Sequence, residues 1–372
     1  MDILFDPYNY PFWVLILSIL SLVAYVIGRP FSTYMKFVYP NAKVEAMGNP
    51  FIGEQELDSI IDNDDIVAFK ETINTLRDYN VQGEDIYSIQ KSLDNTFIEI
   101  IEMMKQDHSK KMSAFFNTYL EKFDIYLLKN ELKKIVTGRQ KEVNVERALL
   151  PKTKKFLEKI KGSEQKELPS LLESYGFTKD VIATLTKEDI DLITFDITLD
   201  TYILSRLQQV RVPYKCEAAK QSYIRSLLDT INIKNILRAK QLAFETDFCK
   251  QLFIGEGSEI AQWKFEELAD IEQVAQVISA LEGTSYFDPL KDAIEAYNKE
   301  PSVQVFETAL DRHLLQLVKN ISLSNYVTLG PTIRFLVSKE FEIKNLKIIV
   351  KGIHEHISAD IIKKLLIWEA GS

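Results

Sequence analysis

The chain contains 372 residues, of which 54 are acidic and 45 basic, so its formal charge at neutral pH is −9. An acidic surface is unsuited to neutralising phosphates, which argues against a nucleic-acid binder. Gly and Pro number 13 and 11, roughly half their usual share, so turn signals are few and long helices are favoured.

The first predicted element is a transmembrane helix over residues 10–29. Residues 10–28 contain no charged side chain, and this length just spans a hydrocarbon core of about 30 Å. Acidic residues precede the run and basic residues follow it, which argues against a signal peptide and predicts an external N-terminus with a cytoplasmic body. The side chains expected to anchor the helix in the membrane are Trp13, Leu15, Leu17, Leu20, Val23 and Tyr25. A buried core helix is the alternative interpretation.

The body is predicted to be helical almost throughout and to contain one segment three times. The copies begin at residues 114, 220 and 332, and aligning Phe123, Ile231 and Phe341 brings them into register with offsets of 108 and 110. A Leu-Asp pair recurs upstream at an almost constant interval, at Leu93-Asp94, Leu199-Asp200 and Leu310-Asp311. The period is too long for a solenoid, so three similar helical domains of about 110 residues each are expected.

The predicted divisions of the chain are an extramembrane N-terminus at 1–9, the transmembrane helix at 10–29, and helical repeats at 36–140, 141–248 and 249–372. Apolar residues at helical spacing predict equivalent core faces in the three repeats. The positions expected to form the repeated core motif are Phe123, Ile231, Phe341, Leu128, Ile236, Leu346, Asn235 and Asn345. Because the aligned position is Leu127 in the first copy, we expect the asparagines to be structural, satisfying backbone groups near a helix end.

The motifs of several chemistries are missing from the sequence. No glycine is followed by lysine, which excludes a Walker A phosphate loop, and Gly255 and Gly257 lack the third glycine of a dinucleotide-binding fingerprint. His354 and His356 have no third metal ligand nearby, and the two cysteines have no zinc-site or disulfide spacing. We therefore expect no catalytic residue, no metal and no cofactor in this chain.

Four stretches carry a resemblance to a known family. They are YPNAKVEAM at 39–47, FDIYLLKNELKKI at 123–135, ALEGTSYFDPL at 280–290 and LGPTIRFLVSKEFEIKNLKIIVKG at 329–352. The chain resembles the C subunits of the archaeal-type (A/V-type) rotary ATP synthases, which are related to the d subunit of the vacuolar proton-pumping ATPase. The last stretch is the most specific, because the family's Glu-x-x-Asn-Leu-Arg element is matched by Glu342, Asn345, Leu346 and Lys347.

The resemblance implies an all-α fold in which three similar helical domains form a pseudo-threefold funnel after the N-terminal transmembrane helix. It also implies a non-catalytic part of the central stalk, which couples the central shaft to the membrane proteolipid ring so that torque links ion translocation to ATP synthesis or hydrolysis. The implied partners are the proteolipid ring, the shaft subunits and, through the N-terminal helix, the lipid bilayer. The alternative function is a membrane-tethered helical adaptor unrelated to rotation.

Overall fold

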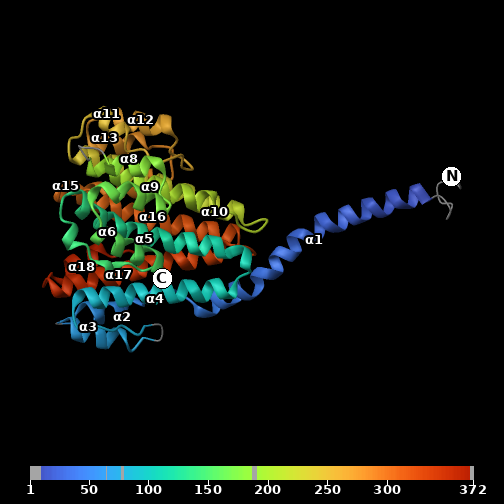
Figure 1. Cartoon of the computed structure of the whole chain (residues 1–372), viewed down its shortest axis with the longest axis horizontal. Coiled ribbons are helices and arrows are strands. Elements are labelled where there is room, and N and C mark those ends of the chain that lie inside the picture. The colour runs from blue at the N-terminus through green and yellow to red at the C-terminus, as the bar shows by residue number, and fades with distance from the viewer. Residues whose placement is uncertain (1–9, 64, 77–78, 187–190, 369–372) are drawn as a thin grey trace.

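The computed structural model describes residues 10–63, 65–76, 79–186 and 191–368. Every regular element in these residues is a helix, which confirms the predicted all-helical class. The predicted extramembrane stretch at 1–9 lies outside the described residues. Six long helices form most of the body (Figure 1), namely α4 (Ile86–Asp107), α5 (Ser113–Val136), α9 (Leu192–Gln209), α10 (Glu217–Gln241), α16 (Gln304–Ser324) and α17 (Gly330–His354).

The predicted membrane segment forms the first half of a longer helix, α1 (Tyr10–Met47). Its apolar part is long and apolar enough to cross a membrane, and none of that part is buried against the body. The sequence predicts an end near Pro30, because proline removes a backbone donor and usually kinks or ends a helix. The helix nevertheless continues through Pro30 and Pro40, and at Pro40 the carbonyl that loses its donor belongs to Lys36, an exposed residue that water reaches. Figure 1 shows α1 leaving the body as a bent rod.

Two of the long helices begin at an aspartate that caps their first turn. Asp85 accepts hydrogen bonds from the backbone N–H groups of Tyr87 (2.8 Å) and Ser88 (3.1 Å), forming a capping box at the start of α4. Asp191 accepts from Ile193 (3.0 Å) in the same way at the start of α9. Such side chains satisfy backbone donors that have no partner inside the helix, and this fixes where each helix begins.

The six long helices form three hairpins, which pack in a closed circuit. Contacts run from α4 to α5, from α5 to α9, from α9 to α10, from α10 to α16, from α16 to α17, and from α17 back to α4. The last of these contacts joins the C-terminal part of the chain to its first hairpin. Neighbouring hairpins therefore support one another on both sides.

An ion pair from the recurring Leu-Asp motif lies at each junction between hairpins. The pairs are Lys129 with Asp200 between α5 and α9, Lys234 with Asp311 between α10 and α16, and Lys347 with Asp94 between α17 and α4. The leucines that precede these aspartates are fully buried. The Leu-Asp motif thus lies on the face by which each hairpin packs against the preceding hairpin of the circuit.

Shorter helices lie between α1 and the first hairpin and between successive hairpins. They are α2 (Glu54–Ile61), α3 (Ile66–Ile73), α6 (Pro151–Gly162), α7 (Leu168–Tyr175), α8 (Lys179–Thr186), α11 (Thr246–Lys250), α12 (Gln262–Asp270), α13 (Val274–Ala280), α14 (Phe287–Asp292) and α15 (Ile294–Lys299), and α18 (Ala359–Leu365) follows the last hairpin. Figure 1 places α6, α15 and α18 at the end of the body that lies away from the projecting half of α1. One end of the body therefore carries short helices, whereas α1 leaves the body at the other end.

Candidate functional site

The second half of α1 contacts the turns of all three hairpins. We call this region the α1 junction and define it as residues 29–41 of α1 together with the hairpin turns at residues 108–112, 210–216 and 324–329. Figure 1 shows α1 leaving the body at the end where these turns lie. The junction is therefore the place at which the apolar segment is attached to the body.

One contact joins α1 to each of the three turns. The guanidinium carbon of Arg29 lies 4.2 Å from the centre of the Tyr214 ring in the turn between α9 and α10. The ring centres of Phe37 and His108, the latter in the turn between α4 and α5, are 5.5 Å apart. The amide nitrogen of Asn41 donates to two backbone oxygens of the turn between α16 and α17, at 2.7 and 3.1 Å. Each hairpin therefore holds the same helix.

His108 lies at the centre of the α1 junction and is buried. Its Nδ1 is 2.6 Å from the backbone oxygen of Met104, and its Nε2 is 2.9 Å from the hydroxyl of Thr332. Because a carbonyl oxygen only accepts, this network assigns the proton to Nδ1, and Nε2 accepts from the threonine. The rings of Phe37 and Phe116 contact the imidazole edge to face. Burial lowers the pKa of His108, so the ring is neutral at neutral pH.

Acidification should therefore weaken the fold through His108. Because the folded chain lowers its pKa, the unfolded chain binds the proton more readily, and the free energy of unfolding falls as the pH drops below about 6.5, the value in an unfolded chain. Chemical denaturation at about pH 7.5 and about pH 5.5 should show a smaller loss for His108→Gln than for the native chain. His354, which is exposed, provides the matched His→Gln control. An equal loss in the His108 variant would contradict this role.

A second polar cluster joins α5 to α17 in the interior. The ammonium of Lys122 donates to both carboxylate oxygens of Glu340, at 2.8 and 3.0 Å, and the hydroxyl of Tyr119 donates to the same carboxylate at 2.7 Å. Burial alone would lower the pKa of Lys122, but the Glu340 carboxylate raises it, so the lysine stays charged. Burial and the same carboxylate raise the pKa of Tyr119, which stays protonated. The cluster therefore fixes two hairpins to each other and offers no free base.

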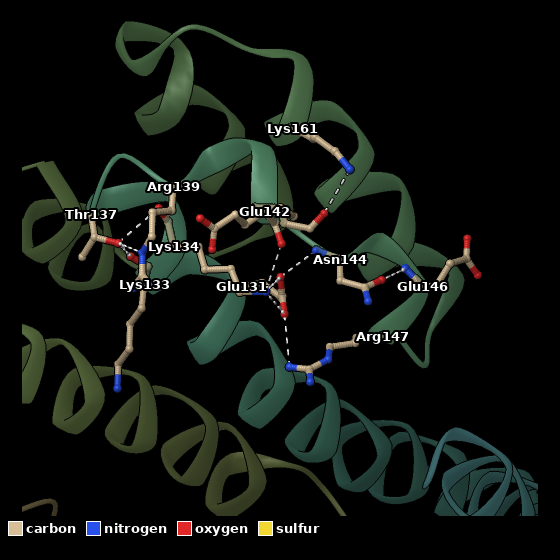
Figure 2. A network of polar contacts seen from close by, with 11 residues as sticks. Glu131, Lys133, Lys134, Thr137, Arg139, Glu142, Asn144, Glu146, Arg147 and Lys161 are labelled. Carbon is tan, nitrogen blue, oxygen red and sulfur yellow. Dashed lines mark hydrogen bonds and ion pairs between the residues drawn. The ribbon is translucent and has the colours of Figure 1, made fainter. Parts of the chain in front are cut away.

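Figure 2 shows a third network, which fixes the segment that follows α5. The fully buried carboxylate of Glu131 accepts from Lys134 at 2.8 and 3.0 Å and from the backbone N–H of Asn144 at 2.8 Å, and it lies 3.5 Å from Arg147. Lys134 also donates to the backbone oxygen of Glu142 at 3.1 Å. One buried charge is thus surrounded by donors, as burial of a carboxylate requires.

In each hairpin, polar side chains on the second helix form hydrogen bonds with the backbone of the segment that follows that helix. Asn235 donates to the backbone oxygen of Leu252 (3.1 Å), and Asn345 exchanges two hydrogen bonds with the backbone of Ile367 (2.6 and 3.0 Å). The aligned residue of the first copy is Leu127, and Asp124, one helical turn earlier, accepts from two successive backbone N–H groups at 2.8 and 3.0 Å. These are the bonds expected of side chains that satisfy the backbone of a connecting segment.

The predicted core positions differ in burial. Phe123 and Ile231 are half-buried, whereas Phe341 is buried. The positions five residues downstream are all fully buried, namely Leu128, Ile236 and Leu346. The predicted membrane-anchor side chains are all exposed, namely Trp13, Leu15, Leu17, Leu20, Val23 and Tyr25.

The described part of the chain contains no group of three or more His, Cys, Asp or Glu side chains that could hold a metal ion. Cys216 and Cys249 are buried and form no disulfide. Burial raises the pKa of the Cys216 thiol to about 12, so it is not a reactive thiolate at neutral pH. What the geometry provides is attachment, of hairpin to hairpin and of all three hairpins to α1.

Comparison with known proteins gives consistent matches over almost the whole chain. The family described as ATP synthase (C/AC39) subunit matches residues 40–365. The C subunit of the A-type ATP synthase of Methanobrevibacter smithii is 29% identical over 364 residues, covering 92% of this chain and 90% of the relative. The proteins of the same name from Methanosphaera stadtmanae and Pyrococcus horikoshii are 28% and 27% identical over 366 and 356 residues, covering 95% and 94% of this chain and 94% and 95% of the relatives.

Proposed function

Since the chain belongs to the C/AC39 family of ATP synthase subunits, we propose that it is the non-catalytic central-stalk subunit of an A/V-type ATP synthase. In this role it joins the central shaft to the proteolipid ring in the membrane. Torque is then passed between the ring and the shaft, and this links ion translocation to ATP synthesis or hydrolysis by other subunits. The catalytic chemistry lies outside this chain.

The α1 junction is the observation that carries this proposal. The apolar helix continues without a linker into the segment that the three hairpins hold, so a force on the body reaches α1 through the backbone and through packed side chains. A flexible tether would allow the body to turn while the membrane part stayed still. A stiff connection is therefore what a rotor subunit needs.

The proposal includes an arrangement of the body as three similar domains, at 36–140, 141–248 and 249–372, in a pseudo-threefold funnel. Its support is the circuit of ion pairs, in which each Leu-Asp motif binds a lysine of the preceding hairpin and Asp94 closes the circle with Lys347. A funnel has an opening that suits the end of one shaft and a wide base that suits a ring of many subunits. The shaft and the ring are the partners at these two ends.

We further propose that residues 10–29 span the cell membrane with the N-terminus outside and the body in the cytoplasm. The support is the charge-free run and the basic residues that follow it, beginning at Arg29. A cysteine placed at Phe31, which is 65% exposed, should then react with a membrane-impermeant reagent only from the cytoplasmic side of sealed vesicles. The native cysteines are buried and contribute little background. Labelling from the outside would refute this orientation.

The linking role can be tested by removing the chain from the complex. A tag on a catalytic subunit should recover the ring proteolipid from detergent-solubilised membranes when the chain is present, and should recover much less when the chain is absent. Adding back the full chain should restore recovery. Equal recovery without the chain would contradict a linking role.

A further inference from the structure

The three connecting segments that precede the hairpins differ strongly in charge. The segments at 48–85 and 242–303 contain ten and thirteen acidic residues against two and four Lys or Arg, whereas the segment at 137–191 contains ten acidic and eleven basic residues. The first part of this segment, at 137–162, has eight Lys or Arg and three Glu. A body built from three similar hairpins therefore carries one basic stretch between two acidic segments.

Three lysines of α6 form a stripe on the exposed face of this helix. Lys152, Lys155 and Lys159 are spaced i, i+3 and i+7, and all three are exposed. Lys152 lies 3.7 Å from Glu121, which also pairs with Arg206 at 2.9 Å, so one carboxylate faces two cations. Neither Lys155 nor Lys159 forms an ion pair with any residue that the structure describes. The stripe therefore keeps most of its positive charge.

Packing and hydrogen bonding hold the stripe in one place. The opposite face of α6 is buried through Phe156, Leu157 and Ile160. Lys161 donates to the backbone oxygen of Val143 at 3.1 Å, which fixes the end of α6 to the segment drawn in Figure 2. The lysines thus project from a helix whose orientation on the body is set.

Helix stability does not account for these lysines. Lys152 and Lys154 lie in the first turn of α6, where the helix dipole disfavours positive charge, and that turn contains no acidic residue. The helix has five lysines and only one glutamate, Glu158. Like charges on one helix face repel one another, and an acidic partner surface would remove that repulsion.

We propose that the lysine stripe of α6 binds an acidic surface on the end of the central shaft and fixes the angle at which the shaft is seated. This inference rests on the proposed function, which places the shaft at the end of the body away from the projecting half of α1, where α6 lies (Figure 1). Three similar hairpins alone would offer the shaft three nearly equivalent positions. One basic stretch between two acidic segments attracts an acidic surface at only one of them.

A fixed angle is what the transmission of torque requires, because a shaft that can turn against the body passes no torque to it. The lysines are exposed, so each ion pair with the shaft is individually weak and is screened by salt. Charges of this kind act mainly by steering the approach of a partner and by selecting its orientation. The expected signature is therefore fast association that slows as the salt concentration rises.

Binding of the purified shaft subunits to the full chain in detergent tests the proposal. The association rate constant of K155E/K159E should be about tenfold lower than that of the native chain at about 50 mM salt, and the difference should shrink at high salt. The matched control is K291E/K299E, which reverses two exposed lysines of the segment at 242–303 and changes the net charge equally. This control should slow association much less.

Crosslinking of the native complex tests the seating angle without a variant. A carbodiimide joins a lysine amine to a carboxylate that touches it, so it should link Lys155 or Lys159 to one acidic stretch of the shaft. Equal linking of that stretch to Lys291 or Lys299 would overturn the single angle.

The outcomes separate this inference from the proposal on which it rests. A native chain that does not bind the shaft subunits contradicts the proposed function itself. Native binding that K155E/K159E matches in rate at every salt concentration overturns the role of the lysine stripe and leaves the proposed function standing.

Discussion

Replacing Leu17 and Leu20 together by arginine should release most of the chain from membranes. Both residues lie near the middle of the charge-free run and are about 60% exposed, so no part of the body shields them. An arginine at the centre of a transmembrane helix costs about 2.5–3.5 kcal/mol on insertion scales, and two such costs outweigh the gain from the remaining apolar residues. The measurement is the fraction of the chain left in the membrane pellet after an alkaline carbonate wash.

The matched control for this change places arginines on the body. Leu242 and Trp263 are 62% and 68% exposed and lie outside α1, so L242R/W263R adds the same charges without affecting a membrane span. This variant should stay in the pellet with the native chain. If L17R/L20R also stays there, α1 does not anchor the chain by crossing the bilayer.

Replacing Asp311 by alanine should lower the free energy of unfolding by about 3–5 kcal/mol. The Asp311 carboxylate accepts from Lys234 of α10 and from Lys344 of α17, at 3.2 Å in the second case. Burial lowers the pKa of Lys234, which shows how costly its charge is at this place. Without the aspartate that cost has no compensation. Urea unfolding of the chain in detergent micelles measures the change.

A second substitution separates the loss of an ion pair from a general loss of packing. Lys234→Met removes the buried charge, so the double variant D311A/K234M should be more stable than D311A alone. Glu295→Ala is the control, because its partner Lys299 and Glu295 itself are 74% and 81% exposed, and it should change stability by less than about 0.5 kcal/mol. A double variant no more stable than D311A would show that the ion pair is not what holds this junction.

The features that sequence reasoning predicted are those that depend on local spacing. The helical class, the apolar run of α1 and the recurring Leu-Asp motif all follow from residue types at fixed intervals. The lysine partners of the motif could not be predicted. Lys129 and Lys347 occupy one aligned position, but Lys234 lies three residues earlier, one helical turn away on the same face. Which lysine reaches an aspartate depends on how the hairpins stack, and a sequence alignment does not contain that information.

The α1 junction was beyond sequence reasoning for the same reason. His108 and its partner Thr332 are 224 residues apart, and the helix that covers them continues through two prolines at which a helix usually ends or kinks. Glu131 did carry a signal that was missed. It follows the core residue Leu128 by three positions and therefore lies on the same buried face. A charged side chain on a buried face needs polar partners, and Figure 2 shows the donors that surround Glu131.

The central claim is that this chain couples the shaft to the ring, and ATP-driven ion uptake tests it most directly. Synthase complexes assembled with and without the chain would be placed in sealed vesicles, and ion uptake and ATP hydrolysis would be measured on the same sample. We expect complexes without the chain to hydrolyse ATP while their ion uptake falls close to background, and we expect the added full chain to restore uptake. Ion uptake per ATP that is the same with and without the chain would contradict the coupling role.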